Sequence, residues 1–268
     1  MLFRSLALAG AGLVCGCSGA VHQLPQISKD NLSLALAEVQ NVDGRPQRHT
    51  ISDDEVLDTL DSVLRRIGPS ADQVCREMNT GVCDWDIRAS ADRRLNANAR
   101  PNGRIEIKRG IFEYADNQEQ IAMVVAHEIG HQAANHLERN HRNQVTGRLV
   151  GAILLGAVGA AVSHGHRDSA FVTRTAMNAG AGVGGYVGGI AYSKEQEREA
   201  DYLSAVILYR AGLDLDKARG FLVKMATASG QKETGLLDTH PAGPERLAAW
   251  DQAVREIRAS NGRLPQRQ

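Results

Sequence analysis

Two histidines stand four residues apart near the middle of this chain, in the segment His127-Glu128-Ile-Gly-His131. The apolar run that begins at Ile121 predicts a helix here, because its apolar residues recur at helical intervals. Residues four apart share one helix face, so both imidazoles can bind one metal ion. Glu128 can reach a water molecule on that metal and take its proton. The motif therefore predicts a helix that carries a catalytic zinc site.

A zinc site of this kind needs a third protein ligand. His136 lies five residues after His131, about 140° around a helix, so we expect it to face away from the metal in a structural or surface role. In residues 193–201, Glu197 and Asp201 are four apart. Glu197 can bind zinc, and Asp201 can orient a ligating histidine. The charged neighbours of this pair leave open that the segment is only a solvated helix face.

The two motifs together resemble those of the gluzincin family of HtpX and the CAAX prenyl endopeptidases, and within it the periplasmic lipoprotein proteases of the BepA and LoiP type. The resemblance covers about residues 52–258 and implies that Glu197 is the third zinc ligand. Residues 96–107 resemble the strand segment before the zinc helix, and residues 239–241 with Arg246 resemble a C-terminal His-Pro motif. A zincin-type fold is the expectation.

The same resemblance places His240 near the zinc. His240, together with Arg246, is expected to stabilise the oxyanion of the reaction. Alternatively, the imidazole of His240 occupies the open fourth position and holds the enzyme inactive. A helix-capping histidine is the structural alternative. Residues 104–108, with Ile105 and Ile107, are expected to form an exposed edge strand that pairs with an extended substrate. The alternative is an ordinary edge strand guarded by its charges.

The first residues have the features of a bacterial lipoprotein signal. Arg4 precedes an apolar run that is too short to span a bilayer, and Val14-Cys-Gly-Cys17 resembles a lipobox. We therefore expect a signal peptide over residues 1–16 and a lipid anchor on Cys17. Ser18 favours the periplasmic side of the outer membrane by the same resemblance. A soluble periplasmic protein is the alternative.

Charge and cysteine content narrow the partners and the compartment. The chain has 31 basic and 31 acidic residues and no large basic block, so we expect no nucleic-acid partner. Apart from Cys15 and Cys17, only Cys75 and Cys83 remain. Their spacing predicts a disulfide that closes a short loop in an oxidising periplasm.

We expect an α+β fold, mostly helical, with a small antiparallel sheet beside the zinc helix. Residues 17–50 are a predicted tether, 51–260 a metallopeptidase domain and 261–268 a polar tail. A helix from residue 52 is expected to end at Gly68-Pro69. Residues 147–191, rich in glycine and alanine, predict two closely packed helices over the zinc site. Alternatives are a mobile lid, or a surface that enters the membrane or engages an unfolded client.

The expected activity is endoproteolysis with one zinc ion per chain, bound by His127, His131 and Glu197, with Glu128 as the proton acceptor. By the resemblance, the substrates are unfolded or misfolded envelope polypeptides, and outer-membrane assembly machinery is a candidate partner. One alternative is a chaperone or assembly factor with the same fold and little proteolysis. A non-catalytic zinc scaffold is the other, and the presence of Glu128 argues against it.

Overall fold

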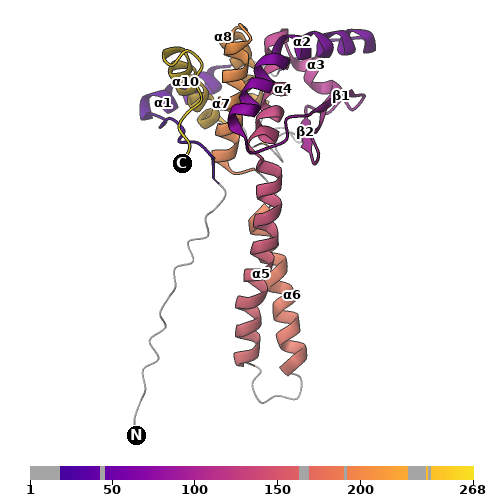
Figure 1. Cartoon of the computed structure of the whole chain (residues 1–268), viewed down its shortest axis with the longest axis vertical. Coiled ribbons are helices and arrows are strands. Elements are labelled where there is room, and N and C mark those ends of the chain that lie inside the picture. The colour runs from indigo at the N-terminus through magenta and orange to yellow at the C-terminus, as the bar shows by residue number, and fades with distance from the viewer. Residues whose placement is uncertain (1–18, 43–45, 163–168, 190–191, 229–239, 241–242) are drawn as a thin grey trace.

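The structure of this chain is a computed structural model that describes residues 19–42, 46–162, 169–189, 192–228, 240 and 243–268. The predicted signal peptide and Cys17 lie outside the described residues. The described chain forms a mostly helical body from which one long helical hairpin projects (Figure 1).

Helix α4 (Gln118–Ala133) runs through the centre of the body. All of its residues from Gln120 onwards are buried. It packs against three further helices, α2 (Asp53–Met78), α7 (Lys194–Arg210) and α8 (Leu215–Ala228). A helix that is enclosed on all sides must be apolar or have paired polar groups, so the polar residues within α4 need specific partners.

A three-stranded sheet lies beside α4, with strands β1 (Asp86–Ser90), β2 (Ala97–Arg100) and β3 (Arg104–Lys108). The strand order is β1-β3-β2, in which β1 is parallel and β2 antiparallel to β3. The sheet is therefore mixed, whereas the sequence predicted an antiparallel one. A tight hairpin joins β2 to β3, but the link from β1 to β2 crosses over β3, and such a crossover makes β1 parallel.

The prediction that β3 is an exposed edge strand is wrong. It is the central strand, and Ile105 and Ile107 are only 2% and 0% exposed. Alternation of isoleucine with charged residues indicates one buried face, but it does not say how many neighbours the strand has. The free edges of the sheet belong to β1 and β2.

Helix α2 continues through Gly68-Pro69, where the sequence predicted its end. A proline inside a helix removes one backbone hydrogen bond. Here buried residues follow on the same helix, including Ala71, Val74 and Met78, so packing outweighs that loss.

The segment predicted as a tether contains a packed helix. Helix α1 (Lys29–Asn41) lies against α10 (Pro244–Ala259), and Ala35 is buried between them. Residues 19–42 are therefore part of the folded body, and the tether prediction is wrong for them.

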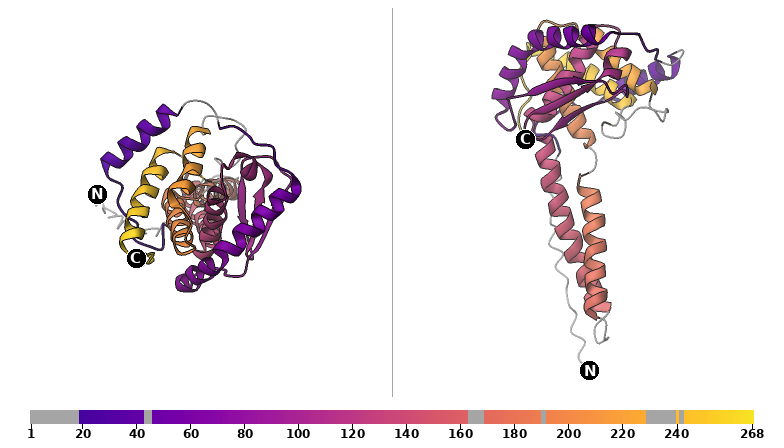
Figure 2. Two further views of the ribbon diagram at one scale, coloured as in Figure 1. Left: turned by 90° about the horizontal axis from the view of Figure 1, so that it is seen from above. Right: turned by 90° about the vertical axis from the view of Figure 1, so that its right-hand side faces the viewer.

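Helices α5 (His136–Val162) and α6 (Ser169–Gly189) form the projecting hairpin (Figures 1 and 2). They pack closely against each other, and a Cβ at Gly159 would lie 2.8 Å from the Cβ of Ala176. The sequence predicted that these two helices cover the metal site. Instead, the hairpin leads away from the body. Within the described residues, the stretch from His136 to Ala161 is long and apolar enough to cross a membrane by length and composition, and little of it is buried.

Candidate metal centre

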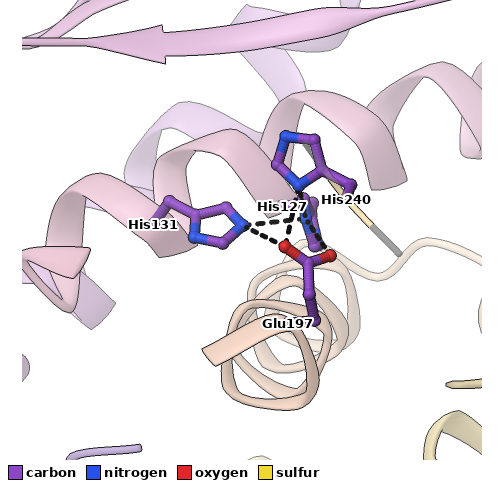
Figure 3. Close-up of side chains that lie close together, drawn as sticks. All are labelled: His127, His131, Glu197 and His240. Atoms are coloured by element: carbon purple, nitrogen blue, oxygen red, sulfur yellow. Dashed lines mark hydrogen bonds and ion pairs between the residues drawn. The ribbon is translucent and has the colours of Figure 1, made fainter. Parts of the chain in front are cut away.

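Helices α4 and α7 bring together the three residues predicted to bind a metal ion (Figure 3). Nε2 of His127 lies 3.0 Å from Nε2 of His131. The Glu197 carboxylate lies 3.5 Å from the former nitrogen and 3.3 Å from the latter. The two imidazoles come from successive turns of α4, as the four-residue spacing predicted.

A glycine allows the two helices to approach this closely. A Cβ at Gly130 would lie 3.1 Å from the carbonyl oxygen of Ala200 and 3.4 Å from the Cβ of Leu203. Helix α7 begins with a capping box, in which Ser193 and Gln196 satisfy each other's backbone N–H groups. The cap fixes where α7 starts and therefore which of its residues face α4.

Asp201 and Arg246 hold this arrangement from behind. Oδ1 of Asp201 lies 2.9 Å from Nδ1 of His127, so it orients that ring as predicted. The Arg246 guanidinium donates to both Asp201 oxygens at 2.8 and 2.7 Å and lies 2.9 Å from Oε2 of Glu197. Arg246 therefore positions two carboxylates, which differs from the direct role at an oxyanion that the resemblance implied.

The charges of the site favour a cation between the imidazoles. Burial raises the pKa of Glu197, but His240 and Arg246 outweigh it and hold that pKa well below its usual range. Burial disfavours a charged His127, yet Asp201 and Glu197 raise its pKa to about 9. The two carboxylates therefore stabilise positive charge at the position where a metal ion would bind.

His240 completes the cluster. Its Nδ1 lies 2.9 Å from Oε1 of Glu197 and 3.3 Å from Nε2 of His127. One ligand atom from each of His127, His131, Glu197 and His240 lies within 4.8 Å of the others, and all four residues are buried. Three nitrogens and a carboxylate oxygen are a donor set that suits tetrahedral Zn²⁺, so the residues fit a metal ion.

Comparison with known proteins decides the family. The sequence profile of peptidase family M48 matches residues 62–254, which is more than half of the chain. This chain belongs to peptidase family M48. Metal-dependent hydrolysis of peptide bonds is the enzyme class of that family. The matched range lies inside the metallopeptidase domain expected from the sequence.

The individual proteins that this chain matches share about a third of their aligned residues with it or fewer. The chain is 32% identical over 163 residues to the beta-barrel assembly-enhancing protease of Yersinia pestis, covering 58% of this chain and 31% of the relative. Identity to the protein of that name from Escherichia coli K12 is 30% over 167 residues, covering 61% and 33%. The mitochondrial metalloendopeptidase OMA1 of Saccharomyces cerevisiae is 28% identical over 184 residues, covering 65% and 49%. The chain thus spans about a third of the length of the first two relatives.

Glu128, the glutamate of the M48 motif, is held without a hydrogen bond. It is 1% exposed, and within the described part of the chain neither carboxylate oxygen has a hydrogen-bond partner. Nε2 of His240 is 3.5 Å from one of them. Burying a carboxylate in this way costs free energy, and such groups are typical of sites that reserve the group for chemistry.

His136 lies outside the cluster of metal-ligand residues among the described residues, but it is a buried partner of His131 and not a surface residue. Its side chain is 0% exposed, and its Nδ1 lies 2.9 Å from Nδ1 of His131. The angular argument assumed an unbroken helix. Helix α4 ends at Ala133, and Asn135 adopts a left-handed conformation with φ 55°, which redirects the chain toward the site. An asparagine after a helical segment is a known stop signal and could have indicated this.

Sequence reasoning also missed Tyr192. Its ring stacks on that of His131 with centroids 3.8 Å apart. It follows α6 and precedes α7, so only the folded chain brings it to the site.

A cavity of about 690 Å³ opens beside the metal centre. Its lining includes Tyr192 and His240 from the site, Gln132 from α4, and Asn98 and Ala99 from β2. The free edge of the sheet therefore faces the same space as His240 and Tyr192 of the site.

Cys75 and Cys83 form the disulfide that their spacing predicted, with Cα atoms 5.7 Å apart. The closed loop packs on the C-terminal end of α4. Thr80 donates to the carbonyl oxygen of Ala133 at 2.7 Å, and Gly81 lies so close to the Gln132 carbonyl that no side chain would fit. The loop thereby satisfies and covers the end of the helix that carries both histidines.

Proposed function

We propose that this M48 peptidase is a zinc-dependent endopeptidase of the bacterial cell envelope that degrades misfolded or unassembled polypeptides. One observation carries the proposal: a buried Glu128, whose carboxylate has no hydrogen-bond partner within the described chain, stands beside the metal-ligand cluster, and His240 of that cluster lines a cavity that also contains a free strand edge. A purely structural metal site needs neither the glutamate nor the strand edge.

His127, His131 and Glu197 would hold the zinc ion, which supplies Lewis-acid activation of water and of the scissile carbonyl when bound. Glu128 accepts a proton from the attacking water and returns it to the leaving amine. Asp201 keeps Nδ1 of His127 protonated, so that Nε2 is free to bind the metal. Arg246 keeps Glu197 and Asp201 ionised and in place.

The substrate backbone would pair with β2, which replaces β3 as the substrate strand. Lys108 N–H donates to the carbonyl of Asn96 at 3.1 Å, so by antiparallel alternation Asn98 directs its backbone groups toward β3. The N–H and C=O of Ala99 then point to the free edge. Main-chain pairing there requires no particular side chains, which suits unfolded substrates.

His240 would act as a restraint. It contacts Glu197 and His127 and lines the cavity beside the site, so water and substrate that enter from this cavity would have to pass it. Its displacement by a client polypeptide would open the site. The transition-state role remains the rival, and the two differ in the sign of the effect of removing His240.

Several features support an envelope location. The disulfide needs an oxidising compartment, and the N-terminal sequence resembles a lipoprotein signal with Cys17 as the anchor. Arg139 at the base of the hairpin donates to the carbonyl of Gly19 at 2.7 Å, only two residues after Cys17. The described chain therefore begins at the end of the body from which the apolar hairpin projects (Figure 1).

A role in assembly is the second candidate function. The name of the bacterial relatives includes assembly enhancement, and the apolar hairpin offers a surface for an unfolded client. A chaperone that rarely cuts would use that surface and leave Glu128 without consequence.

Digestion of casein by the purified full chain separates these functions. Glu128→Gln should retain bound zinc, measured by mass spectrometry, because it spares all the ligands. Hydrolysis should fall by about 10²–10⁴-fold, the usual contribution of an acid–base group. Glu195→Gln, an exposed glutamate on α7, serves as the control and should match wild type. If the Glu128 variant digests casein at the wild-type rate, the proposed mechanism is wrong.

A further inference from the structure

A continuous chain of hydrogen bonds leads from His131 away from the metal-facing side of the ring. Nδ1 of His131 lies 2.9 Å from Nδ1 of His136. Nε2 of His136 in turn lies 2.9 Å from Oε2 of Glu199. All three side chains are 0% exposed. Two buried groups that belong to neither metal-ligand motif therefore stand directly behind this histidine.

This series of hydrogen bonds ends at the N-terminal segment of the protein. Glu199 accepts hydrogen bonds from the backbone N–H of Val21, at 2.8 and 2.9 Å, and from that of His22 at 3.0 Å. Nδ1 of His22 lies 2.6 Å from the same carboxylate, and His22 is only 2% exposed. Residues far apart in the sequence thus share one buried carboxylate.

Further contacts hold the N-terminal segment in place. Gln268 N–H donates to the Val21 carbonyl at 2.9 Å, and Gln23 N–H donates to the Gln266 carbonyl at the same distance. Arg198 on α7 donates to the Pro25 carbonyl at 2.6 Å. The segment is therefore a built part of the structure, clamped between the C-terminal residues and α7.

The backbone donors to Glu199 indicate one direction for this series of hydrogen bonds. A backbone N–H can only donate, so Glu199 is the acceptor at both of its oxygens. His136 then donates through Nε2, and its Nδ1 accepts the proton of Nδ1 of His131. That tautomer leaves a lone pair on Nε2 of His131, which faces Glu197 at 3.3 Å. A metal ligand needs this lone pair.

The two ligand histidines thus have different supports. His127 is oriented directly by Asp201, which belongs to the α7 motif. His131 has an imidazole between itself and its carboxylate, and that carboxylate is held by residues more than 170 positions earlier in the chain.

We propose that Val21 and His22 are an outer layer of the metal centre: by holding Glu199 they fix His136 and thereby position His131 for metal binding. His22, His136 and Glu199 are positioning residues in this scheme, and the scheme rests on the metal-ligand role proposed for His131. Metal binding and docking of the N-terminal segment are then coupled. Because coupling is reciprocal, the metal ion stabilises the docked segment as much as the docked segment strengthens metal binding.

The test measures zinc affinity of the full chain by competition with a chromogenic chelator. Glu199→Gln replaces an acceptor oxygen by an NH₂ group that faces backbone donors, and it should weaken zinc binding about 10–100-fold, as loss of outer-shell partners typically does. His22→Ala keeps Glu199 and should weaken it by about 10-fold, the lower end of that range. Glu195→Gln, exposed on the same helix, should leave the affinity unchanged.

Limited proteolysis supplies the second readout, in the Glu128→Gln background to prevent self-cleavage. Removal of zinc should speed cleavage within residues 19–28, and re-addition should restore protection. A purely structural role for His22 would not make this cleavage depend on zinc.

The outcomes are distinct. If wild type binds no zinc, the proposed function itself fails. If wild type binds zinc, but His22→Ala binds it within about twofold of wild type and N-terminal cleavage ignores zinc, only the coupling is overturned. If Glu199→Gln does not fold, His22→Ala and the cleavage assay decide.

Discussion

At the scale of single residues, Arg246 shows how this site keeps its charges in order. Three imidazoles and three carboxylates lie buried at this site, and one planar guanidinium contacts two of the carboxylates, Glu197 and Asp201. Its fixed fork of donors suits this task better than a lysine ammonium would. The family resemblance implied that Arg246 acts directly on the reacting atoms, but Arg246 instead contacts the carboxylates that support the metal site.

His240 lends itself to a prediction whose sign separates two roles. His240→Ala should raise basal digestion of casein if His240 acts as the proposed restraint, because the imidazole contacts Glu197 and His127 and lines the cavity beside them. The initial rate without added client is the measurement, with exposed His49→Ala as the control. A fall of about 10–10³-fold would instead identify a lost donor to the transition state.

At the scale of helices and strands, the metal centre depends on how closely α4 approaches α7. Gly130→Leu would place a side chain against Ala200 and Leu203 and force the helices apart. Overpacking of this kind costs about 1–3 kcal/mol, and we expect zinc affinity to fall with it because His127 and His131 move away from Glu197. Denaturant unfolding and chelator competition measure the two effects.

The matched control is Gly68→Ala in α2. A Cβ there meets nothing within 4 Å, so the variant should be as stable as wild type or more stable by up to about 1 kcal/mol. Equal zinc affinity in Gly130→Leu and wild type would show that the close approach of α4 and α7 does not set the metal geometry.

The free edge of β2 gives a second prediction at this scale. Ala99→Pro removes a backbone donor that points away from β3, so the sheet should survive while substrate pairing weakens. Loss of one or two hydrogen bonds predicts a rise in KM for an extended peptide of roughly 3–10-fold. Ala99→Val retains the N–H and is the control. Unchanged KM in the proline variant would exclude β2 as the substrate strand.

The local sequence pattern predicted where helices and strands form far better than it predicted which elements pack against one another. The α4 and α7 motifs could be placed because each depends on residues four apart on one helix. The centre of the sheet could not, since the alternation within β3 does not say that β1 and β2 pair with it on opposite sides. Helix α2 continues past Gly68-Pro69 because of tertiary packing that no short window contains. His22 gave no signal, because its partner Glu199 lies 177 residues away.

At the scale of the whole molecule, the hairpin of α5 and α6 projects from the body (Figure 2) and carries most of the exposed large apolar side chains of the described chain. Ten large apolar side chains are exposed on it: Val145, Leu149, Val150, Ile153, Leu154, Leu155, Val158, Phe171, Val172 and Met177. Monomeric soluble proteins rarely expose so large a patch. In water without lipid or detergent, this surface should drive self-association.

Charge introduced on the hairpin tests that expectation. Ile153→Glu combined with Leu154→Glu should reduce self-association in light scattering, because both side chains are well exposed. Unfolding free energy should change by less than about 0.5 kcal/mol, as for other surface substitutions. Leu57→Glu, an exposed leucine on α2, should leave self-association unchanged. A large loss of stability in the hairpin variant would mean that these leucine and isoleucine side chains are covered in solution.

The disulfide between Cys75 and Cys83 should make the metal site depend on the redox conditions under which the protein is produced. The closed loop packs on the last turn of α4, the helix that carries both histidines. A disulfide that closes a loop of this length stabilises the folded protein against unfolding by about 2.5 kcal/mol. Protein produced in a reducing cytoplasm will lack this disulfide. The loop that covers the C-terminal end of α4 will then be less firmly held. A preparation that binds zinc poorly should therefore be assayed for free thiols before any ligand is doubted.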